Sequence, residues 1–453
     1  MTYAEAVRAL FALGRELASP QQARVQKFGL DNITILSEAL GNPHRAAPCV
    51  HIAGTNGKGS TAAMLESILY TAGFRTGLYT SPHLEKINER IRIAGEEISD
   101  DAFAAAWAKV HAAIESLMAS GKLAAHPTFF ECITAMAFVA FAQAKIDFAI
   151  YEVGLGGRLD ATNIVTPEVA VITPIDFDHE NFLGHSIAEI AGEKAGIIKP
   201  GAWVVSSTSR SEPNGVVAAE VIANRAAQQN AKLFDIDQLW QLSVATVQDG
   251  FYRATASPLV APQESIVLAP AIAGRFQIRN ALTAVTAAAL LGEKTFSVPR
   301  AAIERGIASA RWPGRLERIS TNPAVYLDGT HNPAGARELA KFWRENFAST
   351  PIVLVYGAMR DKAVDEIAGQ LFPLAHTVIL TEPRQPRAIS ANLLSEMTSG
   401  LAADTRTVPD AREALEQAIT LAQAAQPNAA VFATGSLFLV GDLRSYWHSR
   451  TKN

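Results

Sequence analysis

The sequence predicts an α/β protein whose larger domain is a P-loop-type, doubly wound and mostly parallel sheet with a small antiparallel appendage. Three observations support this fold class. Short apolar runs alternate with helical stretches of ten or more residues, which is typical of β–α–β units. The first strand runs into a glycine-rich turn containing a lysine, and polar clusters follow later strands. A second alternating set near the C-terminus predicts a second, smaller, Rossmann-like α/β domain.

Length and composition set the domain number and exclude several classes of partner. A chain of 453 residues is too long for one typical core, so we expect two domains, 1–310 and 311–453. The composition, 49% hydrophobic and 19% charged, is that of an ordinary globular protein. A net charge of -4 gives no electrostatic reason to expect nucleic acid or a membrane surface as a partner.

The two cysteines and the apolar stretches indicate the compartment. Cys49 and Cys132 lie in apolar contexts and are interpreted as small core residues, with no disulfide framework or metal spacing. Charged residues interrupt the first 17 residues, which therefore do not form a signal peptide. The longest apolar stretch, 132–142, is too short to span a bilayer. We expect a cytoplasmic protein.

The elements of the first half follow from their stop signals and their apolar spacing. Ser19-Pro20 closes the first helix, and Gly41-Asn42-Pro43 closes the second. A polar active-site loop is expected after the second strand, through Arg90 and Arg92. The predicted elements are helix 3–18, helix 32–40, strand 49–53, helix 61–73, strand 76–80, helix 100–119, helix 128–143, strand 147–153, strand 169–173 and helix 188–196.

The pattern changes in the second half. Short β-like runs over 233–268 predict the antiparallel appendage, and another helix begins within 273–280. Residues 311–315 are interpreted as the linker between the domains. The second domain is predicted from strand 324–328, helix 334–346, strand 352–356, helix 363–371, strand 377–380, helix 411–424 and strand 429–433.

The stretch from His51 to Ser60 has the chemistry of a phosphate cradle. A strand, a glycine turn and a helix N-terminus direct backbone N–H groups and a positive partial charge inward, and Lys58 adds a full charge. The strict phosphate-loop pattern has Ser or Thr directly after the lysine, whereas here Gly59 separates Lys58 from Ser60. The alternative is an ordinary glycine turn between a strand and a helix.

Carboxylates at other strand ends are candidate metal ligands. Glu152 ends an apolar strand and is suited to Mg²⁺, which takes oxygen ligands beside nucleotide phosphates; otherwise it is a solvated strand-end carboxylate. Asp176, Asp178 and His179 crowd another strand end, where the histidine could be a base, a metal ligand or a hydrogen-bonded loop residue.

Further candidates carry weaker signals. The hydroxyls of Ser60 and Ser81 could reach Mg²⁺, and composition alone favours a surface position for Lys194. Arg315 and Asn280 could reach a nucleotide held between the domains, because a guanidinium donates two bonds to phosphate. The stretch 328–333 combines a carboxylate, a glycine turn and an imidazole before a helix.

Taken together, the motifs resemble those of the folylpolyglutamate synthases, including the bacterial enzymes that also act as dihydrofolate synthases, within the ATP-dependent Mur ligase superfamily. Gly59 favours this branch over the peptidoglycan ligases, as does the DGTHNP sequence at 328–333, which lacks the tyrosine of their D-x-Y-x-H-N-P motif. Those ligases also usually carry a domain of about a hundred residues before the loop, whereas 53 residues precede Gly54. The resemblance runs in order through 54–60, 80–84, 128–131, 152–163, 176–179, 193–197, 276–281, 312–315, 328–333 and 434–437.

The resemblance implies a role for each matched position. It implies two Mg²⁺ ions, and it identifies Lys194 as the lysine that CO₂ carbamylates into an anionic oxygen ligand. The implied ATP contacts are Thr55, Asn56, Gly57, Lys58, Gly59, Ser60, Asn280, Arg315 and Asp328. The implied metal ligands are Ser60, Ser81, Glu152, His179 and Lys194. The implied folate pocket is Gly29, Leu30, Thr128, Phe129, Phe130, Glu131, Leu159, Asp160 and Ala161, with Phe28 beside it.

The implied reaction joins L-glutamate to a folate, and to dihydropteroate, through an acyl phosphate made from ATP. Lys58 and Lys194 would act in catalysis, His331 would help to bind glutamate or orient the closed state, and the family precedent is a monomer. Two alternatives remain at this point: a peptidoglycan- or cyanophycin-type amino-acid ligase, and a non-catalytic nucleotide-binding switch.

Overall fold

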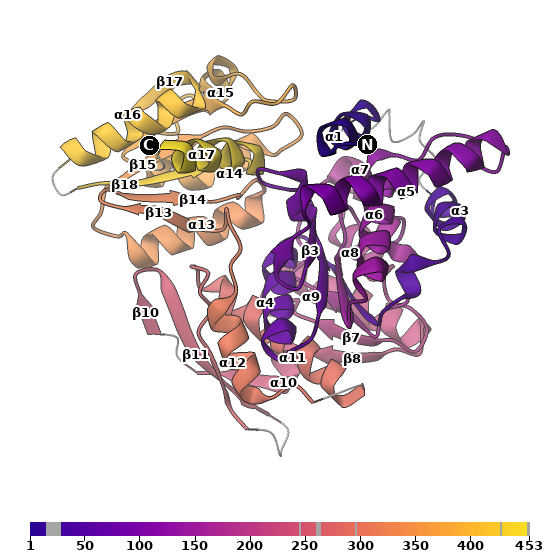
Figure 1. The fold of residues 1–453 in the computed structure, drawn as a ribbon. Helices are drawn as coiled ribbons and strands as arrows, with labels where there is room; N and C mark the ends of the chain where they lie inside the picture. The colour runs from indigo at the N-terminus through magenta and orange to yellow at the C-terminus, as the bar shows by residue number, and fades with distance from the viewer. Residues whose placement is uncertain (15–28, 244–245, 260–263, 295–296, 426–427, 451–453) are drawn as a thin grey trace.

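The computed structural model describes residues 1–14, 29–243, 246–259, 264–294, 297–425 and 428–450. Two α/β units, each with helices on both faces of a sheet, and a small antiparallel sheet make up the fold (Figure 1). This arrangement confirms the predicted fold class. Within the described ranges, no helix is both long and apolar enough to cross a bilayer.

The first unit is built on an eight-stranded sheet with the order β4-β3-β2-β5-β1-β6-β7-β8. Its six strands from β2 to β8 in this order are parallel, and β3 and β4 are antiparallel at one edge. Because β1 lies between β5 and β6, the chain winds outward in both directions from β1, where ligand sites of such sheets form. The strands are β1 Cys49–Ala53, β2 Thr76–Tyr79, β3 Ile91–Ile93, β4 Glu96–Glu97, β5 Phe148–Glu152, β6 Val169–Ile172, β7 Trp203–Ser206 and β8 Lys232–Asp235.

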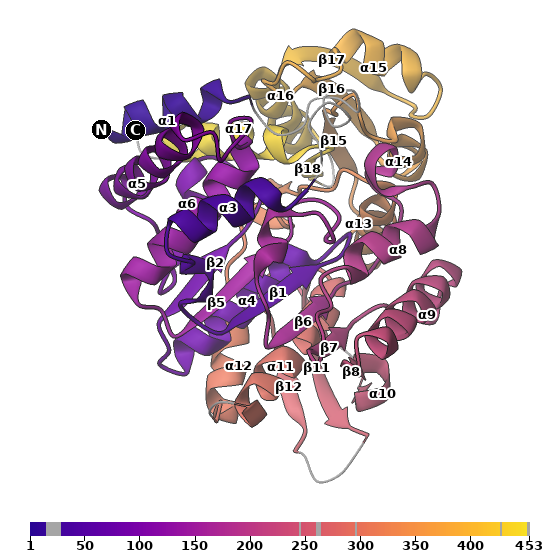
Figure 2. The same ribbon diagram turned by 90° about the vertical axis from the view of Figure 1, so that its right-hand side faces the viewer.

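Helices cover both faces of this sheet (Figure 2). Alternate strand residues pack to opposite sides: Val50 and Ile150 face α4, α11 and α12, whereas Cys49 and Tyr151 face α6 and its neighbours. All five residues of β1 are buried, as expected for a parallel strand covered on both faces. The helices are α1 Tyr3–Ala12, α3 Asp31–Ala39, α4 Lys58–Thr71, α5 Asp100–Ala119, α6 Phe129–Ala144, α7 Glu180–Leu183, α8 Ile187–Ala195, α9 Pro213–Gln228, α10 Ile236–Leu239, α11 Phe276–Lys294 and α12 Arg300–Ser309, with 3₁₀ turns at Pro43–Arg45, Ile87–Arg90 and Ala161–Ile164.

The antiparallel appendage links the two units. It comprises β9 Trp240–Leu242, β10 Thr246–Gln248, β11 Phe251–Pro258 and β12 Ile266–Leu268. Figure 1 shows β10 and β11 extending below the second unit. Tyr252 of β11 donates its hydroxyl to Glu345 Oε2 at 2.6 Å, so the appendage contacts the second unit directly.

The second unit has a six-stranded sheet with the order β13-β14-β18-β15-β16-β17, parallel except for β13. Helices α13 and α14 pack on one face, and α16 and α17 on the other. Its strands are β13 Glu317–Thr321, β14 Ala324–Leu327, β15 Ile352–Tyr356, β16 Thr377–Glu382, β17 Thr405–Asp410 and β18 Ala430–Thr434. Its helices are α13 Pro333–Asn346, α14 Val364–Leu371, α15 Ala391–Met397, α16 Ala411–Ala424 and α17 Leu437–Arg450, with a 3₁₀ turn at Phe372–Leu374.

Three expectations are corrected. The helix predicted over 3–18 ends at Ala12, because Gly14 adopts a positive φ of 89°; residues 15–18, like Ser19-Pro20, lie outside the described residues. The predicted loop through Arg90 and Arg92 is a 3₁₀ turn and the antiparallel strand β3, because β3 pairs with β2. The appendage begins at β9 and not at residue 233, because β8 pairs with β7 in the main sheet.

Candidate active site

Three neighbouring strand ends bring the predicted chemistry together. In the parallel register Ile52 of β1 pairs with Glu152 of β5, and Ala53 pairs with Ile172 of β6. The loop after β1, the end of β5 and the segment after β6 therefore meet at one edge. They open into a cavity of about 2430 Å³ that is lined by both α/β units.

Two glycines of the phosphate loop are required by close approaches. Gly57 has a φ of 86°, and a Cβ there would lie 2.5 Å from Asn280 Oδ1. A Cβ at Gly59 would lie 2.7 Å from Trp312 Nε1 in the connection between the units. The residue that breaks the strict phosphate-loop pattern is thus the one on which the indole rests. Lys58 starts α4, and its Nζ donates to the carbonyls of Gly54 at 3.0 Å and Thr55 at 3.1 Å.

The other polar side chains of the loop already have protein partners. The Thr55 hydroxyl donates to the Asp176 carbonyl at 2.9 Å. Asn56 exchanges two amide hydrogen bonds with Asn332 of the second unit, at 3.2 and 3.0 Å. These contacts hold the loop against the segment that follows β6 on one side and against the start of α13 on the other.

Helix α11 supports the start of α4 from behind. Ser60 is buried and accepts from Gln277 Nε2 at 3.3 Å. Asn280 donates to Gln277 Oε1 at 2.9 Å, one turn further along the same helix. The predicted nucleotide contact Asn280 therefore reaches the loop through α11.

Glu152 is a buried carboxylate and not a solvated strand-end group. It is 5% exposed, and its Oε2 accepts the Ser81 backbone N–H at 3.3 Å, so the predicted metal ligands Ser81 and Glu152 are adjacent. Burial raises the pKa of Glu152 to about 6, although Lys58 and Arg315 oppose the shift. The carboxylate is therefore short of positive charge.

Lys194 is also buried, at 4% exposure, which contradicts the surface position that its composition favoured. Its Nζ donates to the Gly54 carbonyl at 2.8 Å, directly behind the phosphate loop. Burial and the neighbouring charge of Lys58 lower the pKa of Lys194 to about 7. Near neutral pH, a large fraction of this amine is uncharged.

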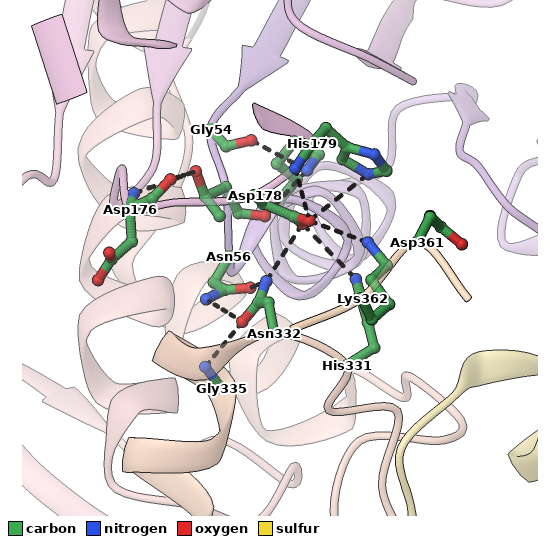
Figure 3. Close-up of polar contacts among 12 residues, drawn as sticks. Gly54, Asn56, Asp176, Asp178, His179, His331, Asn332, Gly335, Asp361 and Lys362 are labelled. Carbon is green, nitrogen blue, oxygen red and sulfur yellow. Dashed lines mark hydrogen bonds and ion pairs between the residues drawn. The ribbon is translucent and has the colours of Figure 1, made fainter. Parts of the chain in front are cut away.

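Asp178 is the centre of a cluster that spans both units (Figure 3). Lys362 Nζ lies 2.9 Å from Oδ1, and Asn332 Nδ2 donates to Oδ2 at 3.2 Å. The Nε2 atoms of His179 and His331 each lie 3.8 Å from a carboxylate oxygen. Burial opposes ionisation of Asp178, but the neighbouring charge of Lys362 outweighs it and holds the pKa of Asp178 well below the usual range.

The two histidines of this cluster are neutral. Burial lowers the pKa of His179 to about 4 and that of His331 to about 3. His331 Nδ1 donates to the Gly329 carbonyl at 2.7 Å, since a carbonyl can only accept, and this leaves Nε2 as an acceptor.

Lys362 was missed by the sequence analysis. It follows β15, a fully buried strand, and so satisfies the same strand-end rule that identified the other candidates.

The linker residues reach the loop from the second unit. Arg315 lies close enough to contribute to the lowered pKa of Lys58, for which burial is the larger cause. The Asp328 carboxylate accepts hydrogen bonds from two backbone N–H groups. Its Oδ2 accepts from Leu316 at 2.9 Å, and its Oδ1 accepts from Thr330 at 3.0 Å. Asp328 thereby orients the segment that carries Arg315.

Most residues of the predicted folate pocket also line the cavity. Phe129, Phe130, Leu159 and Ala161 line it, together with Gly29. Leu30 instead packs against the core that includes α1, α5 and α6, and Phe28 lies outside the described residues. Thr128 and Glu131 line the cavity and bond one another's backbones in a capping box at the start of α6.

The predicted metal ligands share the cavity without forming a closed site. Ser60, Ser81, Glu152, His179 and Lys194 all line it. Among the described residues, no three histidine, cysteine, aspartate or glutamate side chains are grouped so as to hold a metal ion by themselves. Additional oxygen ligands would have to come from a substrate or from water.

Comparisons with known proteins match nearly the whole chain. Residues 52–288 match the Mur ligase middle domain, and residues 314–437 match the Mur ligase, glutamate ligase domain. The dihydrofolate synthase/folylpolyglutamate synthase of Bacillus subtilis is 35% identical over 421 residues, 92% of this chain and 94% of the relative. The Mycobacterium tuberculosis folylpolyglutamate synthase structure complexed with ADP and AMPPCP is 32% identical, with a TM-score of 0.87 and coverage of 98% and 99% of the two chains. The structure of E. coli FolC in complex with DHPP and ADP is 30% identical, with a TM-score of 0.84 and coverage of 100% and 99%.

Proposed function

Because this chain belongs to the Mur ligase family, among its dihydrofolate synthases and folylpolyglutamate synthases, we propose that the cavity between its two units is where ATP drives the addition of L-glutamate to a folate. The chain is an ATP-dependent glutamate ligase of folates. One observation carries the assignment to this cavity. The phosphate-loop lysine, the buried Glu152 and the buried Lys194 converge at adjacent strand ends, and the Asp178–Lys362 ion pair connects the two units in the same cavity.

ATP is proposed to lie along the loop, with its phosphates over the N-terminus of α4. Lys58 leaves its two carbonyl partners and turns to the transferred phosphoryl group, whose growing charge it offsets. Arg315 approaches the same region from the second unit. The remaining proposed contacts are Thr55, Asn56, Gly57, Gly59, Ser60, Asn280 and Asp328.

The donor set fits Mg²⁺. This ion keeps several waters and is usually bound by one or two carboxylates together with substrate phosphates, so a single carboxylate at Glu152 is sufficient for one ion. Ser60 and Ser81 offer hydroxyls, and neutral His179 offers a lone pair for a second ion. Bound Mg²⁺ would supply Lewis-acid stabilisation of the phosphoryl group.

The surroundings of Lys194 also fit a carbamate. Reaction with CO₂ requires the uncharged amine, which the pKa of about 7 makes available. As an ammonium, Lys194 is repelled by Lys58; as a carbamate, it would be attracted to the same group. The modification would place an anionic oxygen ligand beside the loop.

The folate substrate is proposed to lie against Phe129, Phe130 and the 154–161 turn, with Gly29, Thr128, Glu131, Leu159, Asp160 and Ala161 as its other proposed contacts. Its terminal carboxylate takes the γ-phosphoryl of ATP, giving an acyl phosphate and ADP. The glutamate amine then forms the C–N bond as the C–O bond to phosphate breaks. His331 Nε2 is proposed to accept a hydrogen bond from that amine, and contact between the units excludes water that would hydrolyse the acyl phosphate.

The same proposal covers organisation and compartment. We propose a boundary near residue 310 between the ATP-binding domain, 1–310, and the glutamate-ligase domain, 311–453, because the strands of the two α/β sheets fall on either side of it. A cytoplasmic monomer is proposed, consistent with the buried free thiols of Cys49 and Cys132.

One assay tests the function. The purified chain is incubated with ATP, Mg²⁺, labelled glutamate and each of dihydropteroate and tetrahydrofolate in turn, and products are resolved by mass. We expect glutamate-dependent ADP release and a mass increase of one glutamate with both pterins. No amide product with any pterin would exclude the proposal; nucleotide binding without amide formation would indicate a switch instead.

A further inference from the structure

A buried polar chain connects the middle of β1 to the folate side of the cavity. His51 is 0% exposed, and its Nε2 lies 2.8 Å from Thr162 Oγ1. Thr162 Oγ1 in turn lies 2.5 Å from Asp160 Oδ1. The mechanism described above gives His51 and Thr162 no part.

The hydrogen bonds in this chain have one direction. An ionised carboxylate can only accept, so the Thr162 hydroxyl donates to Asp160 and uses its lone pair to accept from His51 Nε2–H. His51 Nδ1 is then unprotonated, and it has no hydrogen-bond partner among the described residues. A buried nitrogen without a partner costs free energy. The only hydrogen bond of the His51 ring among the described residues is therefore the one that Nε2 donates to Thr162.

Asp160 holds the turn that forms the cavity wall. Its Oδ2 accepts the backbone N–H groups of Gly154 and Leu155, both at 2.9 Å, and its Oδ1 accepts the Thr162 N–H at 3.0 Å. Gly154 is in turn packed under Phe130, since a Cβ there would lie 2.5 Å from the ring. The orientation of the carboxylate therefore sets how the turn meets Phe130.

We propose that His51 is a positioning residue for the folate substrate, acting through Thr162 to fix the Asp160 carboxylate and the wall of the pocket. The proposal rests on the proposed location of the folate site. It assigns to β1 two separate tasks: its C-terminal end leads into the phosphate loop, while its central histidine orients the folate wall. Breaking the His51–Thr162–Asp160 hydrogen bonds should raise KM for the pterin substrate more than KM for ATP.

The test compares conservative and disruptive variants at both positions. Thr162→Val and His51→Leu remove the hydroxyl and the donor, whereas Thr162→Ser and His51→Gln keep them. KM for the pterin, KM for ATP and kcat are measured from ADP release, and folding is followed by thermal melting. We expect the disruptive variants to raise KM for the pterin about fivefold to tenfold, with KM for ATP changed less than twofold. The conservative variants should stay within about twofold of wild type.

Two further arms separate positioning from a general loss of stability. The double variant His51→Leu/Thr162→Val should have about the same KM for the pterin as either single variant, because both substitutions break the same series of hydrogen bonds. Thr286→Val is the matched control: it removes a buried hydroxyl that accepts from Trp240 Nε1 at 3.1 Å, away from the cavity, and should lower the melting temperature without raising KM for the pterin.

Equal increases in both KM values, or an unchanged KM for the pterin in Thr162→Val, would overturn the proposal. If His51→Leu does not fold, the Thr162 pair decides it. Failure of the proposed function is distinguishable, because wild type would then form no amide with any pterin.

Discussion

Two buried carboxylates flank the phosphate loop and differ in how their charge is balanced. Glu152 ends β5, and burial raises its pKa to about 6, although the charge of Lys58 opposes the shift. Asp178 follows β6 and lies 2.9 Å from Lys362, and its pKa is far below the usual range. Both side chains are largely withdrawn from water.

The difference is that Asp178 is paired directly with a protein cation, whereas Glu152 is not. The positive charge beside Asp178 comes from the second unit, so it binds the two units together. Among the described residues no lysine or arginine is ion-paired with Glu152, and a bound cation would offset the cost of its desolvation. The four predictions below test this contrast, from the largest expected effect to the smallest.

Removing the cation on the Glu152 side should have the largest effect. Lys58→Met is expected to lower kcat for ADP release by about a thousandfold or more, because charge developing on the phosphoryl group loses its nearest protein cation. Steady-state ADP release measures the change. Lys232→Met, which removes a lysine from the distant edge strand β8, is the control. A loss below tenfold in Lys58→Met would contradict the assigned role.

Removing the cation on the Asp178 side should act on stability. Lys362→Met leaves a buried carboxylate unpaired and is expected to lower the free energy of unfolding by about 3 kcal/mol at pH 7. Because the folded-state pKa of Asp178 is depressed, its stabilising effect is present above the unfolded pKa and lost as the pH falls through the folded value. Denaturant unfolding measures the change. The double variant Lys362→Met/Asp178→Asn should recover most of the lost free energy of unfolding. An equal loss in the single and the double variant would refute the pairing.

Lys194 lies near Lys58 and Asp178, and its variant tests the proposed carbamate. Lys194→Ala is expected to lower kcat about a hundredfold, because an anionic oxygen ligand is lost. Added acetate should restore part of the activity. ADP release with and without acetate, and the mass of the intact wild-type chain under bicarbonate, provide the measurements. Wild-type activity in the variant would remove the assignment.

The smallest effect concerns the pH dependence of metal binding at Glu152. Burial raises the pKa of Glu152, so its protonation favours the folded state below about pH 4.5. That contribution to stability is lost as the pH rises through about 6. Below pH 6, Mg²⁺ must displace a proton, so its apparent Kd should weaken about tenfold per pH unit. Calorimetric titration with Mg²⁺ and ADP measures this, with Glu152→Gln as the reference for the nucleotide's own titration. Identical pH profiles would show that Glu152 is not a ligand.

Much of the fold and part of the candidate site could be predicted because their signals are local. The strands 49–53 and 352–356 agree with β1 and β15 residue for residue, since short apolar runs bounded by turn residues are visible without tertiary information. By contrast, β7 and β13 were missed, and β3 was read as a loop, because their status depends on pairing with other strands. Lys362 had a local signal, a strand end, but no motif to single it out.

By itself, the sequence determined the α/β class, the phosphate loop and the candidate residues at successive strand ends, because periodicity and turn chemistry are properties of neighbouring residues. The tertiary structure decided what those residues meet. Lys194 lies behind Gly54 across 140 positions, and Lys362 reaches Asp178 across 184. Gly59, visible in the sequence as an extra glycine, acquired its reason only from the Trp312 indole that rests on it. Such long-range contacts follow from how distant elements pack within one unit and between the two units, and no local pattern encodes them.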